Sequence, residues 1–147
     1  MALISAAGRT VTNLPTTTAG PGVFAGATSG KFWLREIGVF NTTAVAVAVG
    51  VAVCTATGTQ VGGLTEYQTD DASAPAPSET AFTSMSTAAT VAATIRQASL
   101  GASVGSGIVF TFEEKEVEIP EGTGNGVIIN CPTGTAQHLD FYIKYQK

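Results

Sequence analysis

The segment between residues 45 and 53 alternates valine with small residues. Its valines are Val45, Val47, Val49, Val51 and Val53, and an alanine or a glycine separates each from the next. Successive side chains point to opposite faces in a strand, and β-branched valine favours that conformation. Because both faces of this segment are apolar, both must be covered, in the middle of a sandwich or against a neighbouring subunit. The segment therefore predicts a central strand of a β-rich fold.

Further strands are indicated before and after this segment. The last ten residues alternate Leu139, Phe141, Ile143 and Tyr145 with mostly polar residues, which is typical of an antiparallel strand with one buried face. Shorter patterns predict strands at 9–14, 31–40, 61–68, 108–112, 116–119 and 127–131, with turns at 121–126 and 132–135 and an exposed loop at 69–80. Residues 88–100 fit a strand or a helical face, and the context favours a strand. Together these elements predict an all-β sandwich or barrel of about eight strands.

The length of 147 residues suits a single domain. We expect residues 31–147 to form its β-sandwich, and residues 1–30 to form an extended N-terminal arm that belongs to the same domain. The arm contains Gly, Pro and Thr, which favour flexible or extended backbone. Six apolar residues of the arm are expected to be buried against a partner: Leu3, Ile4, Val11, Leu14, Val23 and Phe24.

Charge and composition argue against several classes of protein. Seven basic and eleven acidic residues give a net charge of −4, and the basic residues are scattered, so we expect no nucleic-acid binding. The apolar run 44–54 is too short to cross a membrane, and the first residues lack the pattern of a signal peptide. We therefore expect no membrane partner and synthesis in a cytoplasm. Cys54 and Cys131 lie in apolar segments and are expected to be reduced and buried.

Residues with catalytic or metal-binding chemistry are few. His138 is the only histidine, and no zinc-site or phosphate-loop spacing occurs. Five glutamates between Glu113 and Glu121 surround Lys115, as a solvated face or a docking site for a basic surface. Glu66, Asp70 and Asp71 lack the spacing of a calcium loop, and the glycosylation sequon at residues 41–43 carries little weight without a secretory signal. The sequence predicts a protein that is not an enzyme and has no metal and no cofactor.

Two segments carry a resemblance to a known family. Residues 34–66, LREIGVFNTTAVAVAVGVAVCTATGTQVGGLTE, and residues 100–147, with the turn IPEGTGNG and a closing aromatic strand, resemble small virion structural proteins of tailed bacteriophages. The resemblance implies a jelly-roll-like antiparallel sandwich that acts as a capsid decoration (cement) protein. Its expected partner is the major capsid protein and its expected location is the capsid surface of a virion made in the host cytoplasm. The family motif is a folding pattern, so no site residues are transferred.

The same resemblance leaves alternatives open. Relatives of this kind also serve as tail, neck or fibre components of phages.

A hypothesis from a different functional class is a carbohydrate-binding β-sandwich in which Trp33, Tyr67 and Tyr142 stack on sugars. The low charge content of 12% and the two apolar faces of residues 45–53 further predict a homo-oligomer, expected to be a homotrimer.

Overall fold

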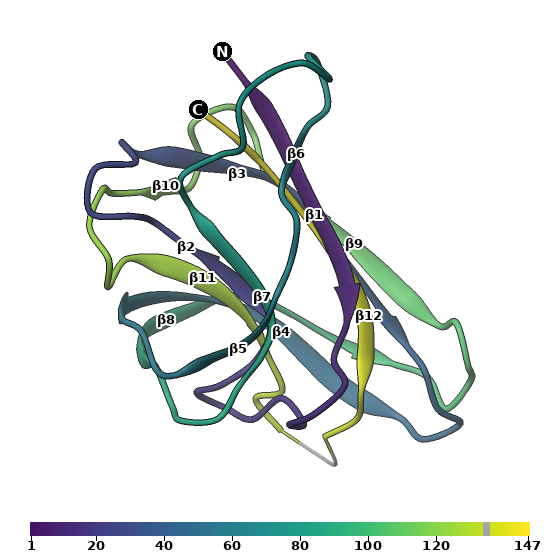
Figure 1. The fold of residues 1–147 in the computed structure, drawn as a ribbon. Coiled ribbons are helices and arrows are strands. Elements are labelled where there is room, and N and C mark those ends of the chain that lie inside the picture. Colours follow the sequence, from purple (N-terminus) through teal and green to yellow (C-terminus); the bar gives the residue numbers. More distant parts are fainter. Residues whose placement is uncertain (134–135) are drawn as a thin grey trace.

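The computed structural model describes residues 1–133 and 136–147, and every regular element in this part of the chain is a strand (Figure 1). The all-β prediction is thus confirmed. The strands are β1 (Leu3–Arg9), β2 (Gly22–Phe24), β3 (Phe32–Asn41), β4 (Val47–Ala56), β5 (Gln60–Gly63), β6 (Tyr67–Gln68), β7 (Thr80–Met85), β8 (Thr90–Leu100), β9 (Gly107–Thr111), β10 (Glu118–Ile119), β11 (Gly126–Asn130) and β12 (Leu139–Gln146). Twelve strands replace the expected eight or so, because several have only two to four residues.

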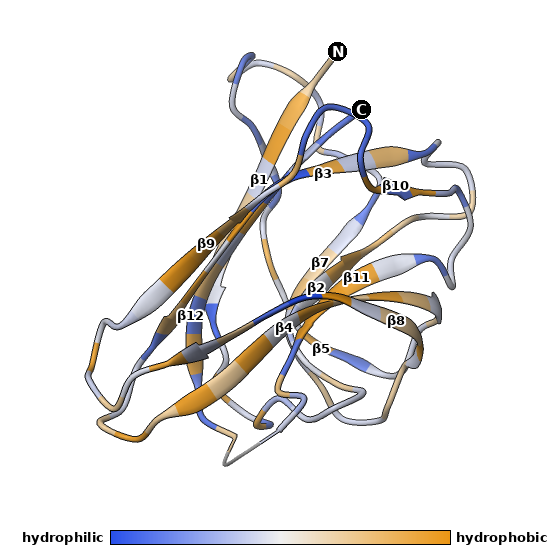
Figure 2. Ribbon diagram, turned by 180° about the vertical axis from the view of Figure 1, so that it is seen from behind, coloured by the Kyte–Doolittle hydropathy of each residue, from blue (hydrophilic) through white to orange (hydrophobic). Residues whose placement is uncertain are grey.

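The strands form two antiparallel sheets that pack face to face as a sandwich (Figure 1). Sheet A has the order β10-β3-β12-β1-β6, and β9 pairs with β3 on the edge that β10 also uses. Sheet B has the order β5-β7-β2-β11-β4-β8. Figure 2 shows hydrophobic residues along β4, β9 and β11, from both sheets. The main core lies between the sheets and includes Ile37, Ile143, Val49 and Ile129, all fully buried.

Pairing partners are nested along the chain. The first strand pairs with the last, β1 with β12, in sheet A, and β2 pairs with β11 in sheet B. Moving inward, β3 pairs with β9 in sheet A and β4 pairs with β8 in sheet B. At the ends of the chain, Ala2 and Lys147 exchange two backbone hydrogen bonds of 3.1 and 3.0 Å, so the two termini lie side by side (Figure 1).

The valine-rich segment forms β4, which has a neighbour on each edge, as predicted for a central strand. Val47, Val49 and Val51 face the core between the sheets, and Ala52 and Cys54 lie on the opposite face. The strand begins two residues later than predicted, and Val45 is 46% exposed. The reason is a turn, since the side chain of Asn41 donates a hydrogen bond of 2.6 Å to the carbonyl oxygen of Val45.

The segment 1–30, predicted as an extended arm of the same domain, contributes two strands to the sandwich. Residues 3–9 form β1 between β12 and β6, and residues 22–24 form β2 between β7 and β11. The linking residues pack closely on β11, where a Cβ atom on Gly20 would lie 1.8 Å from the carbonyl oxygen of Ile129. Gly20 therefore permits close approach to a neighbouring strand. The predicted strand at 9–14 is wrong, because β1 ends at Arg9.

Of the other predicted strands, loops and turns, some are confirmed and some are corrected. Residues 88–100 contain the long strand β8, which settles the choice between strand and helix. The predicted strand 61–68 is two short strands in different sheets, β5 in sheet B and β6 in sheet A. The loop 69–80 is confirmed except for its last residue, which begins β7. The turn predicted at 132–135 lies partly outside the described residues, since 134 and 135 are not among them.

Candidate functional site

The outer face of sheet A is exposed to solvent and carries aromatic side chains. In β12, Leu139, Phe141, Ile143 and Tyr145 are buried in the core, so the alternate residues point outward. The pairing register places residues of the neighbouring strands beside them. We call this surface the open face, and its members are Ala7, Arg9, Trp33, Glu36, Gly38, Phe40, Tyr67, Val109, Asp140, Tyr142 and Lys144.

Two rings of the open face cover glycines on neighbouring strands. A Cβ atom at Gly38 would lie 2.1 Å from Cε1 of Tyr142, and one at Gly107 would lie 2.2 Å from Cδ1 of Phe40. The two rings are themselves neighbours, with centroids 6.4 Å apart. A ring packed over a strand glycine fills the space that the missing side chain leaves. Together with Val109, which is 45% exposed, the rings give the middle of the open face an apolar surface.

Charged groups of the open face are paired with one another. Arg9 Nε lies 2.5 Å from Asp140 Oδ1, and Lys144 Nζ lies 3.2 Å from Glu36 Oε1. The hydroxyl of Tyr142 donates a 2.6 Å hydrogen bond to the same Glu36 oxygen. The hydrogen bond from Tyr142 holds the pKa of Glu36 below its usual value, and the bond from Arg9 does the same for Asp140. The open face therefore presents apolar rings beside ion pairs that neutralise each other.

Sheet B differs because its outer face is covered by the chain itself. Phe24, Ala52, Phe82 and Ile128 on that face are buried in a second apolar cluster. Ala19 and Ala89 cover the cluster, and the backbone N–H of Ala89 donates to the carbonyl of Thr18 at 2.9 Å. The Asn130 side chain, also on this face, donates a 2.9 Å hydrogen bond to the carbonyl of Thr17. Sheet A has no comparable cover among the described residues, which makes the open face the leading candidate for contact with a partner.

The six predicted partner-binding residues do not form one surface. Ile4, Val23 and Phe24 belong to the buried clusters, each at most 2% exposed, so in this structure they pack against the chain's own core and not on its surface. Leu3 is half-buried in β1. Val11 and Leu14 remain available, at 63% and 46% exposure. Sequence analysis missed the open face because it is defined by the register between strands, although the alternation in residues 138–147 correctly places Tyr142 outward.

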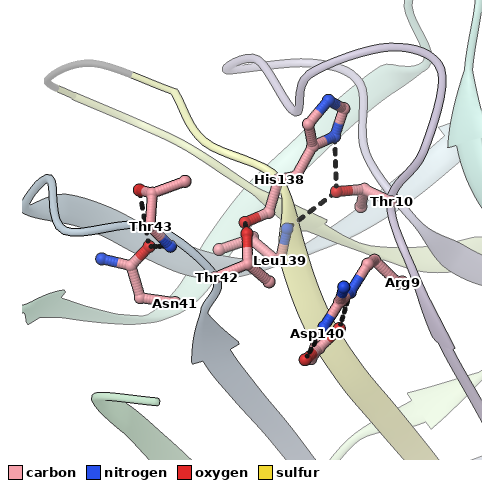
Figure 3. Close-up of polar contacts among 8 residues, drawn as sticks. All are labelled: Arg9, Thr10, Asn41, Thr42, Thr43, His138, Leu139 and Asp140. Carbon is pink, nitrogen blue, oxygen red and sulfur yellow. Dashed lines mark hydrogen bonds and ion pairs between the residues drawn. The ribbon is translucent and has the colours of Figure 1, made fainter. Parts of the chain in front are cut away.

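His138 lies in a polar cluster at the start of β12 (Figure 3). Its Nδ1 is 3.1 Å from the hydroxyl of Thr10, and that hydroxyl accepts a 2.8 Å hydrogen bond from the backbone N–H of Leu139. Asp140, which could orient a histidine, is instead paired with Arg9. Thr10 is 1% exposed, so its hydroxyl is closed to a substrate. The cluster joins the end of β1 to the start of β12, and it has neither access for a substrate nor a third group that orients the histidine.

The neighbouring sequon is also a structural feature. Asn41 is 1% exposed, and its side-chain nitrogen donates to the carbonyls of Val45 and Gly101 at 2.6 and 3.2 Å. Its side-chain oxygen accepts hydrogen bonds from the backbone N–H and the hydroxyl of Thr43 (Figure 3). The amide is therefore fully engaged in a turn and is not accessible for glycosylation.

Three of the acidic residues near Lys115 each bind a different partner. Glu116 pairs with Arg96, Glu118 pairs with Lys31 at 3.1 Å, and Glu121 accepts a 2.7 Å hydrogen bond from the backbone N–H of Gly30. Asp70 and Asp71 likewise bind the N–H groups of Leu3 and Ser73. Within residues 1–133 and 136–147, no three His, Cys, Asp or Glu side chains are grouped as a metal site requires.

One groove lies beside these glutamates, between β4, β8 and β10. It has a volume of about 380 Å³ and is lined by residues that include Cys54, Ile95 and Ile119. The carboxylates that line it, Glu116 and Glu118, are both paired with cations.

Cys54 and Cys131 are buried, free and on opposite faces of sheet B, and burial raises the pKa of each thiol to about 11. In the part of the chain that is described, no helix has the length and hydropathy needed to span a membrane.

Comparison with known proteins gave no relative. A scan against protein-family models, a search of curated proteins and a search of solved structures each returned no match.

Proposed function

We propose that this protein is a structural protein of a tailed-phage virion, specifically a capsid decoration protein that binds the outside of the capsid and stabilises it. The observation that carries the proposal is the contrast between the two sheets. Sheet B is covered by its own chain, whereas sheet A exposes rings beside ion pairs that neutralise each other. Aromatic residues with little unpaired charge are typical of the centre of a protein–protein interface. The partners are the major capsid protein and further copies of the chain.

The proposal includes a jelly-roll connectivity. In a jelly roll, nested antiparallel strand pairs alternate between two sheets. The pairs β1–β12, β2–β11, β3–β9 and β4–β8 follow that alternation here, and the order β9-β3-β12-β1 lies opposite β2-β11-β4-β8. The short strands β5 to β7 then form an insertion between β4 and β8. This arrangement supports the resemblance to virion proteins that residues 34–66 and 100–147 suggested.

A decoration protein stabilises the capsid by binding the assembled form more tightly than the free subunits. A rigid body suits this role, because little conformational entropy is lost on docking. The rings of the open face meet this condition, since Tyr142 is fixed by its hydrogen bond to Glu36 and by packing on Gly38. No catalytic step is part of the mechanism.

The proposal is tested by co-purification with phage particles. We expect the protein on full particles in a symmetric ratio to the major capsid protein. Val109→Glu, on the open face, should reduce occupancy, and Val104→Glu, at a 71% exposed valine between β8 and β9, serves as the matched control. Thermal unfolding of both variants shows whether the fold is retained. Full occupancy with Val109→Glu would remove the open face from the mechanism, and protein found only on tails would assign the chain to a tail, neck or fibre component.

A homotrimer is part of the same proposal. The apolar rings of the open face and the exposed Val11 and Leu14 offer surface for contacts between copies. Light scattering is expected to give three times the mass of the chain. A monomer in solution that binds particles in threefold clusters would make the trimer dependent on assembly, and monomers on the particle would contradict it.

A second candidate function is carbohydrate binding, favoured by one observation. Trp33, Tyr67 and Tyr142 all lie on the open face, and Tyr67 is 51% exposed. Against this function, Lys31 Nζ lies 5.1 Å from the centroid of the Trp33 ring and competes with a sugar for that ring. A glycan array distinguishes the candidates, because binding that Trp33→Ala and Tyr67→Ala abolish would favour a carbohydrate-binding module.

A further inference from the structure

Two carboxyl groups and a tyrosine hydroxyl meet near the ends of the chain. Glu66 directly precedes β6, Glu79 directly precedes β7, and Tyr145 lies near the end of β12. The Tyr145 hydroxyl is 3.0 Å from Glu66 Oε1 and 3.4 Å from Glu79 Oε2. The Glu79 side chain and Tyr145 are both 0% exposed, so water does not complete their hydrogen bonds.

The number of donor hydrogens limits how many hydrogen bonds this cluster can form. A tyrosine hydroxyl has one hydrogen to donate, and two ionised carboxylates have none. With both carboxylates ionised, one of them faces the hydroxyl without a donor, and an unsatisfied buried charge is unfavourable. One proton added to a carboxyl group supplies the missing donor. Among these three side chains, both contacts of the tyrosine hydroxyl are hydrogen bonds only when one glutamate is protonated.

The surrounding charges decide which glutamate holds that proton. The charged and titratable groups facing Glu66 are Tyr145 from β12, Lys147 just after β12, and Glu79 in front of β7. Lys147 Nζ lies 2.8 Å from Glu79 Oε1, so Glu79 has a cation partner. Glu66 has no ion pair among the described residues, and the negative charge of Glu79 opposes its ionisation. Glu66 is the group that takes up the proton.

The two glutamates enclose the segment 69–78, which joins β6 to β7. Hydrogen bonds at its start, from Thr69 to the Leu3 carbonyl at 2.8 Å and from Leu3 to Asp70 at 3.2 Å, attach it to β1. The other hydrogen bonds of this segment are internal and join Asp71 to Ser73 and Ala74. The contacts of Glu66 and Glu79 with Tyr145 thus hold both ends of the segment against β12.

We propose that Glu66, Glu79 and Tyr145 form a proton-dependent latch, which fixes the segment 69–78 when Glu66 is protonated and loosens it when Glu66 is ionised. Burial is the main cause that raises the pKa of Glu66 to about 7. Because this value lies above the pKa of about 4.3 in an unfolded chain, the protonated latch contributes its full stability below about pH 4.3. That contribution is lost as the pH rises toward and through about 7. The latch is independent of the proposed function.

The test uses NMR on the full chain with ¹³C-labelled glutamate. The side-chain carbon of Glu66 should titrate with a midpoint near pH 7, and the amide signals of residues 69–78 should change with the same midpoint. Glu66→Gln, which cannot ionise, should abolish the change in the segment, whereas Glu118→Gln, at an exposed glutamate paired with Lys31, should leave it unaltered. Tyr145→Phe removes the hydroxyl that contacts both carboxyl groups, so the pH-dependent change in the segment 69–78 should be lost.

Three results would overturn the latch. The first is an ordinary midpoint for Glu66, near pH 4.5. The second is a segment 69–78 whose amide signals do not respond between pH 5.5 and 8.5. The third is a pH response of the segment that persists in Glu66→Gln. Because every readout is on the folded chain, a variant that fails to fold is detected directly by its spectrum, and the wild-type titration alone still decides the proposal.

Discussion

The ring of Tyr142 lies across the backbone of Gly38, its direct partner in the pairing of β3 with β12. Glycine normally weakens a strand, because it has no side chain to pack and loses more backbone entropy on folding. Here the ring takes the place of a side chain, and its hydroxyl is held by Glu36 two residues away on β3. The packing of the ring and its hydrogen bond therefore depend on the absence of a Cβ atom at Gly38.

Gly38→Ala is expected to lower the free energy of unfolding by about 1–3 kcal/mol, as overpacking typically does. The added Cβ would lie 2.1 Å from Cε1 of Tyr142, so the ring must move and its hydrogen bond to Glu36 is weakened. Urea denaturation measures the change. Gly63→Ala is the control, because a Cβ atom there meets nothing within 4 Å. Equal effects of the two substitutions would contradict the structural role of Gly38.

The pH dependence of Glu36 depends on the same hydroxyl. Since the hydrogen bond from Tyr142 lowers the pKa of Glu36 in the folded chain, Glu36 contributes stability above its unfolded pKa of about 4.3. This stability is lost as the pH falls through the lower folded value. Tyr142→Phe should therefore raise the pKa of Glu36 in an NMR titration, while Tyr67→Phe should leave it unchanged. An unaltered Glu36 titration in Tyr142→Phe would show that the hydrogen bond has no influence.

The valines of the 45–53 segment should differ sharply in their tolerance of charge. Val49 is 0% exposed in the core, so Val49→Asp buries an unpaired carboxylate and is expected to destabilise the fold by several kcal/mol, about 3–5. Val45 is 46% exposed, and Val45→Asp should change stability by less than about 0.5 kcal/mol. Thermal or urea unfolding of both variants makes the comparison, and similar losses would place Val45 inside the strand after all.

Both cysteines are expected to resist labelling in the native protein. Their thiol pKa is raised to about 11 by burial, so the reactive thiolate is scarce at pH 8. A thiol reagent should modify Cys54 and Cys131 slowly at pH 8 and rapidly in denaturant, with mass spectrometry reporting each site. Fast modification of either residue under native conditions would show that its surroundings open.

The predictable part of the fold is the part with strong side-chain alternation. β4 and β12 have large apolar residues at every second position, and both were predicted close to their observed bounds. β1 was placed too late, because its residues from Ser5 to Gly8 are small and give little contrast between faces. The three-residue strand β2 was not predicted, because its pairing with β7 and β11 is set by tertiary contacts. Glycines in this region were interpreted as flexible, whereas Gly20 and Gly22 are required for close approach to β11.

The candidate sites were harder to predict for a related reason. The outward direction of Tyr142 follows from the pattern of residues 138–147, but its partners Gly38 and Glu36 lie about a hundred positions earlier and depend on register. Glu66 fell in the predicted strand 61–68, and Glu79 fell in the predicted exposed loop 69–80. They are brought to Tyr145 by loops, and local sequence has no periodicity from which loop paths can be inferred.

The mutual hydrogen bonds of Ala2 and Lys147 have a consequence for how fast the chain folds. The pairing of β1 with β12 joins residues at opposite ends of the sequence, so closing it requires ordering a loop that contains almost the whole chain. Folding rates fall as such long-range contacts increase. A circular permutant that links residue 147 to residue 1 through a short turn, with new ends in the segment 69–78, would make β12 and β1 a local hairpin. Folding of sheet A could then begin at this hairpin of β12 and β1. Stopped-flow refolding of the permutant should therefore be faster than that of the original chain.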